Sequence, residues 1–206
     1  MASVITVKYF DSWSVDWFSY QVNYIMSAGQ PVIPIIIDSY GGEVYSAFAM
    51  IDILKATGKP ISTMIRGKAM SAGALLFTAG SKGMRFIGEN AALMIHDSAC
   101  CSWGKMAENS ANAKEGERVT SLMLSHFDKA ANKSSGFFNQ EIINRRGADW
   151  YLSPQEAVSL GLADDIKTPL IFNNLCLDDL LLCQELTGEE SSEVQDCSGQ
   201  GESLTP

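Results

Sequence analysis

Residues 31–66 read "PVIPIIIDSYGGEVYSAFAMIDILKATGKPISTMIR", and this stretch decides the fold. The continuous apolar run before the glycine pair is typical of a strand that is buried on both faces. Residues 44–55 favour a helix, which the Gly and Pro of "TGKP" bring to an end. Residues 61–66 then predict another strand. This order predicts a right-handed crossover between two parallel strands.

The same alternation continues on both sides of this stretch. Further strands are expected at 4–10, 84–87 and 92–96, and helices at 13–27, 71–79, 105–131 and 154–162. Strands that alternate with helices favour an α/β fold around a mostly parallel sheet. The helix at 105–131 has a mixed polarity, so we expect it to project partly from the body.

Charge is distributed unevenly along the chain. The formal net charge is −9, and eight acids but no Lys or Arg follow residue 168. We therefore expect one domain over residues 1–172 and an acidic, largely disordered tail over residues 173–206. The nearly neutral body argues against nucleic-acid binding, which needs a basic surface.

Other classes of protein are excluded by what the sequence lacks. No apolar run is long enough to cross a membrane, and the N-terminus does not read as a signal peptide. The five cysteines form no CxxC pair, which favours a reducing cytoplasm and argues against a metal site. No cofactor is expected.

Two turns and one histidine are candidates for chemistry. Gly41–Gly42 follows a strand and precedes a helix, so its N–H groups suit an anion, although an ordinary tight turn reads the same way. Ser71 in "GKAMSAGA" stands at the start of a helix, as a nucleophile or as an N-cap. His96 follows a strand, where functional groups of α/β proteins gather, whereas His126 lies within a helix and is expected to be structural.

The motifs together resemble the proteolytic subunit of the Clp protease, ClpP. "DSYGGE" corresponds to the Ser-Pro-Gly-Gly of that family, "GKAMSAGA" to the sequence around its nucleophile, and "ALMIHDS" to the sequence around its base. "DWYLSPQEAVSLGL" resembles the segment that carries its acid, and the likeness covers roughly residues 3–170. The resemblance implies the ClpP/crotonase-like fold of repeated ββα and βαβ units with a protruding handle helix.

The resemblance also implies roles for five residues. Ser71 matches the nucleophile, His96 the general base and Asp149 the acid that orients it. The backbone N–H groups of Gly42 and Ala72 match the oxyanion hole. The implied activity is that of a serine endopeptidase, which cleaves peptides or unfolded polypeptides inside a homo-oligomeric ring, with stacked heptamers as the family arrangement.

Departures from the family keep alternatives open. The family's Pro before Gly-Gly is Tyr40, and the segment "SACCSWGKMAENS" lacks the expected glycine-rich lead-in. The sequence begins near the family's first core strand, which leaves an AAA+ unfoldase partner open. The alternatives are a non-catalytic Clp-core subunit, an acyl-CoA hydratase or isomerase, and a Ser–Lys peptidase that uses Lys68. Asp97 is a local rival to Asp149.

Overall fold

The computed structural model describes residues 3–97 and 104–173, and residues 174–206 of the expected acidic tail and all five cysteines lie outside these ranges. The described chain is a mixed α/β structure, which confirms the expected class. Its elements in chain order are β1 (Ile5–Val7), α1 (Ser12–Ser27), β2 (Ile33–Ser39), α2 (Val44–Thr57), β3 (Ile61–Met70), α3 (Ala72–Phe77), β4 (Arg85–Ile87), β5 (Ala92–Ile95), α4 (Met106–Ala130), α5 (Phe137–Asn144), β6 (Trp150–Leu152), α6 (Pro154–Leu160), β7 (Asp165–Ile166) and the 3₁₀ helix η1 (Leu170–Asn173).

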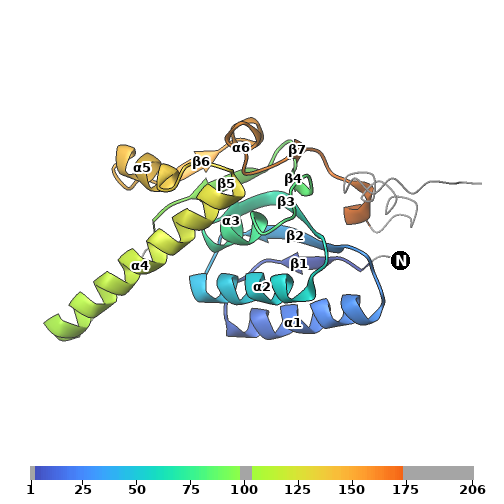
Figure 1. The fold of residues 1–206 in the computed structure, drawn as a ribbon, viewed down its shortest axis with the longest axis horizontal. Helices are drawn as coiled ribbons and strands as arrows, with labels where there is room; N and C mark the ends of the chain where they lie inside the picture. The colour runs from blue at the N-terminus through green and yellow to red at the C-terminus, as the bar shows by residue number, and fades with distance from the viewer. Residues whose placement is uncertain (1–2, 98–103, 174–206) are drawn as a thin grey trace, which may run out of the picture.

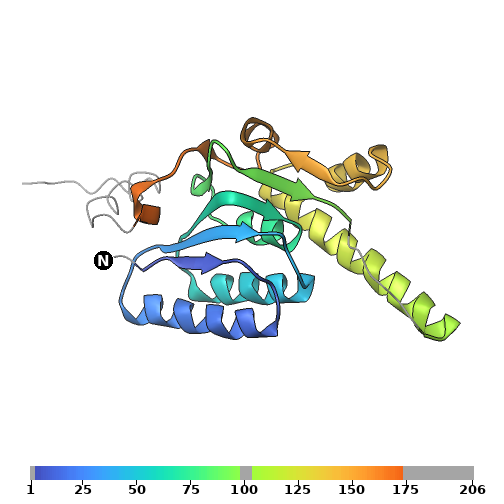
Figure 2. The ribbon, with the colours of Figure 1, turned by 180° about the vertical axis from the view of Figure 1, so that it is seen from behind.

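One twisted sheet joins all the strands of the described residues. The order β1-β2-β3-β4-β7 is parallel throughout, β5 pairs in parallel with β3, and β6 pairs antiparallel with β5. The parallel β2–α2–β3 unit expected from residues 31–66 is confirmed. The sheet places the ends of β2, β3 and β5 side by side (Figures 1 and 2).

The middle of β2 is buried on both faces, as its apolar run predicts. Ile35 and Ile37 contribute to the main core with the residues of α1, α2 and α3, whereas Ile36 packs into a second cluster on the other face. That second cluster contains residues from β3, β4 and η1, including Phe86 and Phe172 with ring centroids 6.4 Å apart. Burying both faces of β2 removes large aliphatic side chains from water, which stabilises the centre of the sheet.

Strand β3 continues past the point at which the sequence predicted its end. The expected strand stopped at Arg66, but β3 runs through Gly67 to Met70. Gly67 has φ +91, and the register with β2 shifts between Ile37 and Ser39 at the same level. Pairing with β5 supplies hydrogen-bond partners to this second half of β3. The strand therefore continues through Gly67, although glycine weakens a strand interior.

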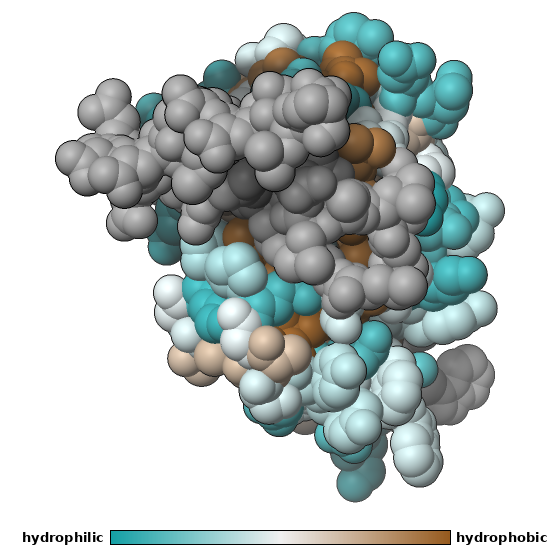
Figure 3. Space-filling model, turned by 90° about the vertical axis from the view of Figure 1, so that its right-hand side faces the viewer, coloured by the Kyte–Doolittle hydropathy of each residue, from teal (hydrophilic) through white to brown (hydrophobic). Residues whose placement is uncertain are grey.

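Helix α4 projects from the body, as expected for a handle helix. Its buried residues, from Val119 to Asp128, all lie in its second half, and Figure 1 shows its first half extending away from the sheet. No helix among the described residues is long and apolar enough to cross a membrane. Around the end of the molecule at η1, hydrophilic residues predominate over small hydrophobic patches (Figure 3).

Candidate active site

Ser71 occupies a strained turn between β3 and α3. Its φ is +54 and its ψ is −118, a conformation that non-glycine residues rarely adopt. Although Ser71 stands at the N-cap position of α3, its side chain makes no capping hydrogen bond. The N-cap interpretation of this serine is therefore wrong as regards its hydroxyl, because the side chain does not satisfy the helix end.

The glycine pair lies against Ser71. A Cβ atom added to Gly41, which has φ +104, would come within 2.8 Å of Ser71 Cβ and 2.9 Å of Met70 O. A Cβ atom on Gly42, which has φ +148, would come within 2.5 Å of Phe10 O. Both positions therefore need glycine for their backbone conformation and for their close approach to neighbouring backbone.

Among residues 3–97 and 104–173, two backbone N–H groups beside Ser71 have no hydrogen-bond acceptor. Ala72 is the first residue of α3, and the first N–H groups of a helix have no acceptor within that helix. At the other turn, Gly41 N donates to Ser39 Oγ at 3.0 Å and Glu43 N donates to Phe10 O at 2.8 Å. Within residues 3–97 and 104–173, the Gly42 N–H between them has no acceptor.

His96 and Asp149 face each other across an antiparallel strand pair. His96 follows β5 and Asp149 precedes β6, and the register pairs Ile95 with Trp150. His96 Nδ1 lies 3.7 Å from Asp149 Oδ1, and the two side chains are 20% and 48% exposed. This distance is longer than a hydrogen bond, but it is short enough for an ion pair when the imidazole is protonated. Asp97 is exposed, and among the described residues it forms no ion pair with His96.

The sheet brings Ser71 next to the strand that ends at His96. Met70 pairs with Met94 in the ladder between β3 and β5, and Ser71 N donates to Met94 O at 3.0 Å. Ser71 and His96 therefore each lie just beyond the ends of neighbouring strands. In the described part of the chain, no hydrogen bond joins their side chains, and such bonds are often long before a substrate binds.

Lys68 is near Ser71 in sequence, but its ammonium is engaged elsewhere. Lys68 Nζ lies 2.7 Å from Asp38 Oδ1 and 4.3 Å from the centre of the Tyr40 ring. The hydrogen bond to Asp38 raises the pKa of Lys68 above its ordinary value. A lysine in this state keeps its proton near neutral pH and is a poor general base.

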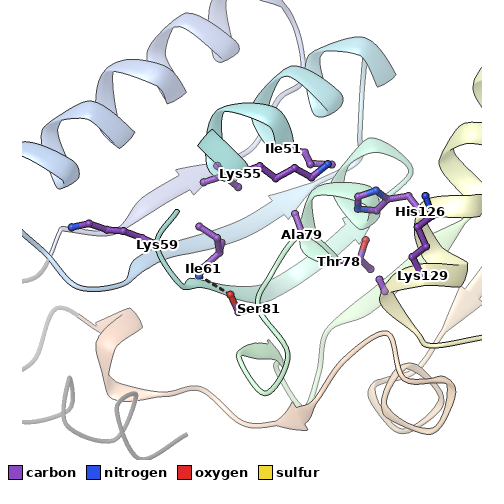
Figure 4. Close-up of a pocket in the computed structure, with 11 residues that line it drawn as sticks. Ile51, Lys55, Lys59, Ile61, Thr78, Ala79, Ser81, His126 and Lys129 are labelled. Carbon is purple, nitrogen blue, oxygen red and sulfur yellow. Dashed lines mark hydrogen bonds between the residues drawn. The ribbon is translucent and has the colours of Figure 1, made fainter. Parts of the chain in front are cut away.

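His126 lies in a different part of the molecule, as expected of a structural histidine. It lines a pocket together with residues of α2, of the end of α3 and of α4, none of which belongs to the set around Ser71 (Figure 4). Burial lowers the pKa of His126 to about 4, with further contributions from the positive charges of Lys55 and Lys129. The imidazole is therefore neutral at pH 7.

Two side chains pack against Trp150, the residue that follows Asp149, and the sequence did not predict these contacts. The Arg145 guanidinium lies 3.7 Å from the centre of the Trp150 ring, and the Phe138 ring lies 5.9 Å from the same ring. Arg145, which caps the end of α5, also bonds to Glu141 of that helix. Because the indole packs against two neighbours, the start of β6 is fixed; the only sequence signal is an aromatic residue directly after Asp149.

No group of three or more metal-ligating side chains occurs among residues 3–97 and 104–173. The groups that the fold places around Ser71 are a hydroxyl, an imidazole, a carboxylate and two backbone N–H groups.

Comparison with known proteins gives the family. A family model described as Clp protease matches residues 16–169. An ATP-dependent Clp protease proteolytic subunit from Deinococcus radiodurans is 30% identical over 134 residues, which are 65% of this chain and 64% of the relative. The chain thus spans about 64% of the length of this curated relative. Because the family model covers most of the described residues, the chain belongs to the Clp protease family.

Proposed function

We propose that this chain is a serine endopeptidase whose nucleophile is Ser71. The observation that carries the proposal is the position of the serine. Its backbone is strained, its hydroxyl makes no capping bond, and it lies so close to the glycine turn that a Cβ added to Gly41 would come within 2.8 Å of its own Cβ. Backbone strain of this kind is held at functional sites by the surrounding structure.

The proposed reaction uses five groups in two half-reactions. His96 takes the proton of the Ser71 hydroxyl as its oxygen attacks the scissile carbonyl carbon. Asp149 orients the imidazole and stabilises its cation. The N–H groups of Gly42 and Ala72 donate to the oxyanion of the tetrahedral intermediate. His96 then protonates the leaving amine. In the second half-reaction, His96 takes a proton from a water molecule that attacks the acyl carbonyl carbon, and it returns this proton to Ser71 as the serine oxygen leaves.

Two competing activities are less well supported. A Ser–Lys peptidase would need a neutral Lys68, but its ion pair with Asp38 favours the charged form. An acyl-CoA hydratase or isomerase would use the two N–H donors without needing the pairing of His96 with Asp149. A non-catalytic Clp-core subunit remains the alternative that an activity assay addresses directly.

We infer the remaining properties from membership of the family. The substrates are peptides or unfolded polypeptides, and the chain assembles into a ring whose chamber encloses Ser71. A Clp ATPase of the AAA+ class would deliver folded substrates, and the location is the cytoplasm. These proposals follow from the matched family model and from the name of the relative, which is an ATP-dependent proteolytic subunit.

A fluorophosphonate probe tests the nucleophile. The probe is expected to label the full-length protein at Ser71, and Ser71→Ala to abolish both labelling and the cleavage of a fluorogenic peptide. Ser121→Ala, at an exposed position on α4, is the matched control and should change neither. Labelling that persists in Ser71→Ala would refute the assignment. Light scattering on the same samples tests assembly, and a 22.4 kDa particle would contradict the ring.

A further inference from the structure

Two adjoining pockets form a basic groove on the side of the molecule that carries α2 and α4. Their volumes are about 480 and 610 Å³, and they share Thr78, Lys129 and Ala130. We call them together the lysine groove, after the four lysines that border it: Lys55, Lys59, Lys82 and Lys129. The ammonium of Lys59 donates to Gln30 O and points away from Lys55 and Lys129 (Figure 4), so the charge inside the groove comes from the other three. These lysines come from the end of α2, from two loops and from the end of α4, so only the fold brings them together.

The positive charge of the groove is poorly balanced by the described residues. The one carboxylate that lines it there is Asp164, and Arg85 already holds it through contacts of 2.9 and 2.6 Å. Lys55 has an exposed partner in Asp52 at 3.6 Å. Among residues 3–97 and 104–173, neither Lys82 nor Lys129 has an ion-pair partner.

Lys55 and Lys129 reach toward one point in the groove. Figure 4 shows His126 between them, with Lys55 coming from α2 and Lys129 from α4. The positive charges of both lysines contribute to the low pKa of His126, whereas Asp52 opposes them. The potential at this point is therefore positive, and a carboxylate bound there would be attracted to both ammonium groups.

The chain itself contains a segment of the opposite charge. Residues 174–206 contain no Lys or Arg, and their eight acids are Asp178, Asp179, Glu185, Glu189, Glu190, Glu193, Asp196 and Glu202. The function proposed above gives this segment no role. Its charge complements that of the lysine groove, and such complementarity is the usual basis of selective but salt-sensitive association.

The described chain ends at the amino ends of the strands, on the face of the sheet opposite the main core to which α2 contributes, so the segment that follows must pass around the end of the sheet to reach the groove. Phe172 packs with Val32 and Met84 at the amino ends of the strands. Part of the groove borders the same end of the sheet, because Ile61 lines it at the start of β3 and the neighbouring Pro60 O accepts from Ile33 N. Asp178 and Asp179 follow Asn173 by five and six residues. An extended chain advances about 3.4 Å per residue, so these carboxylates reach roughly 17–20 Å from Asn173.

We propose that the acidic segment 174–206 docks into the lysine groove of its own chain. The contact is electrostatic, and each exposed ion pair contributes little by itself. Docking within one molecule, however, replaces a bimolecular encounter by an effective concentration in the millimolar range, so several weak pairs suffice. This interaction does not depend on the role proposed for Ser71, and it remains testable if the peptidase assay fails.

Zero-length carbodiimide cross-linking of the full-length chain tests the proposal. The reagent activates a carboxylate, and a lysine amine in contact with it forms an amide. At low salt, mass spectrometry is expected to find links from Lys55, Lys82 and Lys129 to acids of residues 174–206, and high salt should abolish them. Links that favour Lys8, Lys105 or Lys114 would overturn the proposal. Mixing ¹⁵N-labelled and unlabelled protein separates the two geometries, and links between copies would refute docking within one chain.

Two sets of variants sharpen the test. Lys55→Gln with Lys129→Gln should reduce the yield of tail links at least about tenfold, whereas Lys105→Gln with Lys114→Gln, at exposed positions, should leave it unchanged. In NMR titrations, Asp178→Asn with Asp179→Asn should lower the measured pKa of His126 by on the order of 0.5. An unchanged pKa would count against docking. A second outcome would also count against docking: inorganic phosphate shifts the His126 signal while no cross-link to residues 174–206 is found. That result would indicate a site for free oxyanions.

Discussion

His96 Nδ1 lies 3.7 Å from Asp149 Oδ1, although more than fifty residues separate the two in the chain. The antiparallel pairing of Ile95 with Trp150 creates this relationship, because it places the residue after β5 opposite the residue before β6. Asp149 is about half exposed, so its carboxylate can rotate toward the imidazole with little loss of packing. The geometry suits a carboxylate that orients a base.

Replacing Asp149 tests that relationship. Asp149→Asn should lower kcat about 10²–10⁴-fold, because an amide can hold the imidazole in the wrong tautomer and cannot stabilise its cation. KM should change much less. Steady-state hydrolysis of a fluorogenic peptide measures both constants. Asp97→Asn is the control and should keep more than half of the activity; a greater loss there than at Asp149 would reverse the assignment.

Gly41 should tolerate no side chain. Gly41→Ala would place a methyl group 2.8 Å from Ser71 Cβ, so the serine turn must move and labelling by the fluorophosphonate should fall at least about tenfold. Gly29→Ala is a matched control, because Gly29 also has positive φ but no atom lies within 4 Å of the added Cβ. Labelling rates are compared between the two variants at a temperature at which both remain folded. Equal rates in Gly41→Ala and Gly29→Ala would contradict the proposed site.

His126 should make the protein sensitive to acid. Burial lowers its pKa to about 4 in the folded state, against about 6.5 when unfolded. The unfolded state therefore binds more protons between these values, and the stability conferred by neutral His126 is lost as the pH falls from 6.5 toward 4. The loss from pH 7 to pH 4.5 is up to about 2 kcal/mol, and less if tail carboxylates occupy the groove.

Urea unfolding at several pH values measures this loss. The His126→Gln variant should show a flatter dependence than the parent between pH 6.5 and pH 4.5. All other titrating groups are common to both proteins, so the difference between the two curves isolates His126. Parallel curves would mean that His126 is solvated in the folded state.

Among the ion pairs of the described residues, we expect the pair of Arg85 with Asp164 to lower the free energy of unfolding most when it is broken. The two side chains are 6% and 16% exposed, and Arg85 Nη2 lies 2.6 Å from Asp164 Oδ1. Asp164→Ala should lower the free energy of unfolding by about 3–5 kcal/mol, because it leaves the buried guanidinium without its counter-charge. Denaturant midpoints measure the effect.

An exposed pair provides the comparison. Asp165 lies 2.9 Å from Lys167, and both side chains are about half exposed. Asp165→Asn should therefore change the free energy of unfolding by less than about 1 kcal/mol. Equal effects of Asp164→Ala and Asp165→Asn would show that burial does not govern these two pairs.

Local sequence predicted the elements whose signals lie within themselves. The apolar run of β2, the amphipathic pattern of α1 and the Ser–Pro start of α6 were all assigned correctly. Helix α5 and strands β6 and β7 were missed. β6 and β7 have only three and two residues, and their form depends on partners elsewhere in the sheet, which a local pattern does not contain.

The sequence by itself determined the order of strands and helices, the double burial of β2, and the acidity of residues 174–206, because side-chain polarity and period act locally. Only the tertiary structure decided that β3 passes Gly67, that Ser71 adopts positive φ, and that His96 meets Asp149. It also brought Lys55, Lys82 and Lys129, from distant segments, to one groove. Each of these depends on hydrogen bonds or packing between segments far apart in the chain, which form only when the sheet closes.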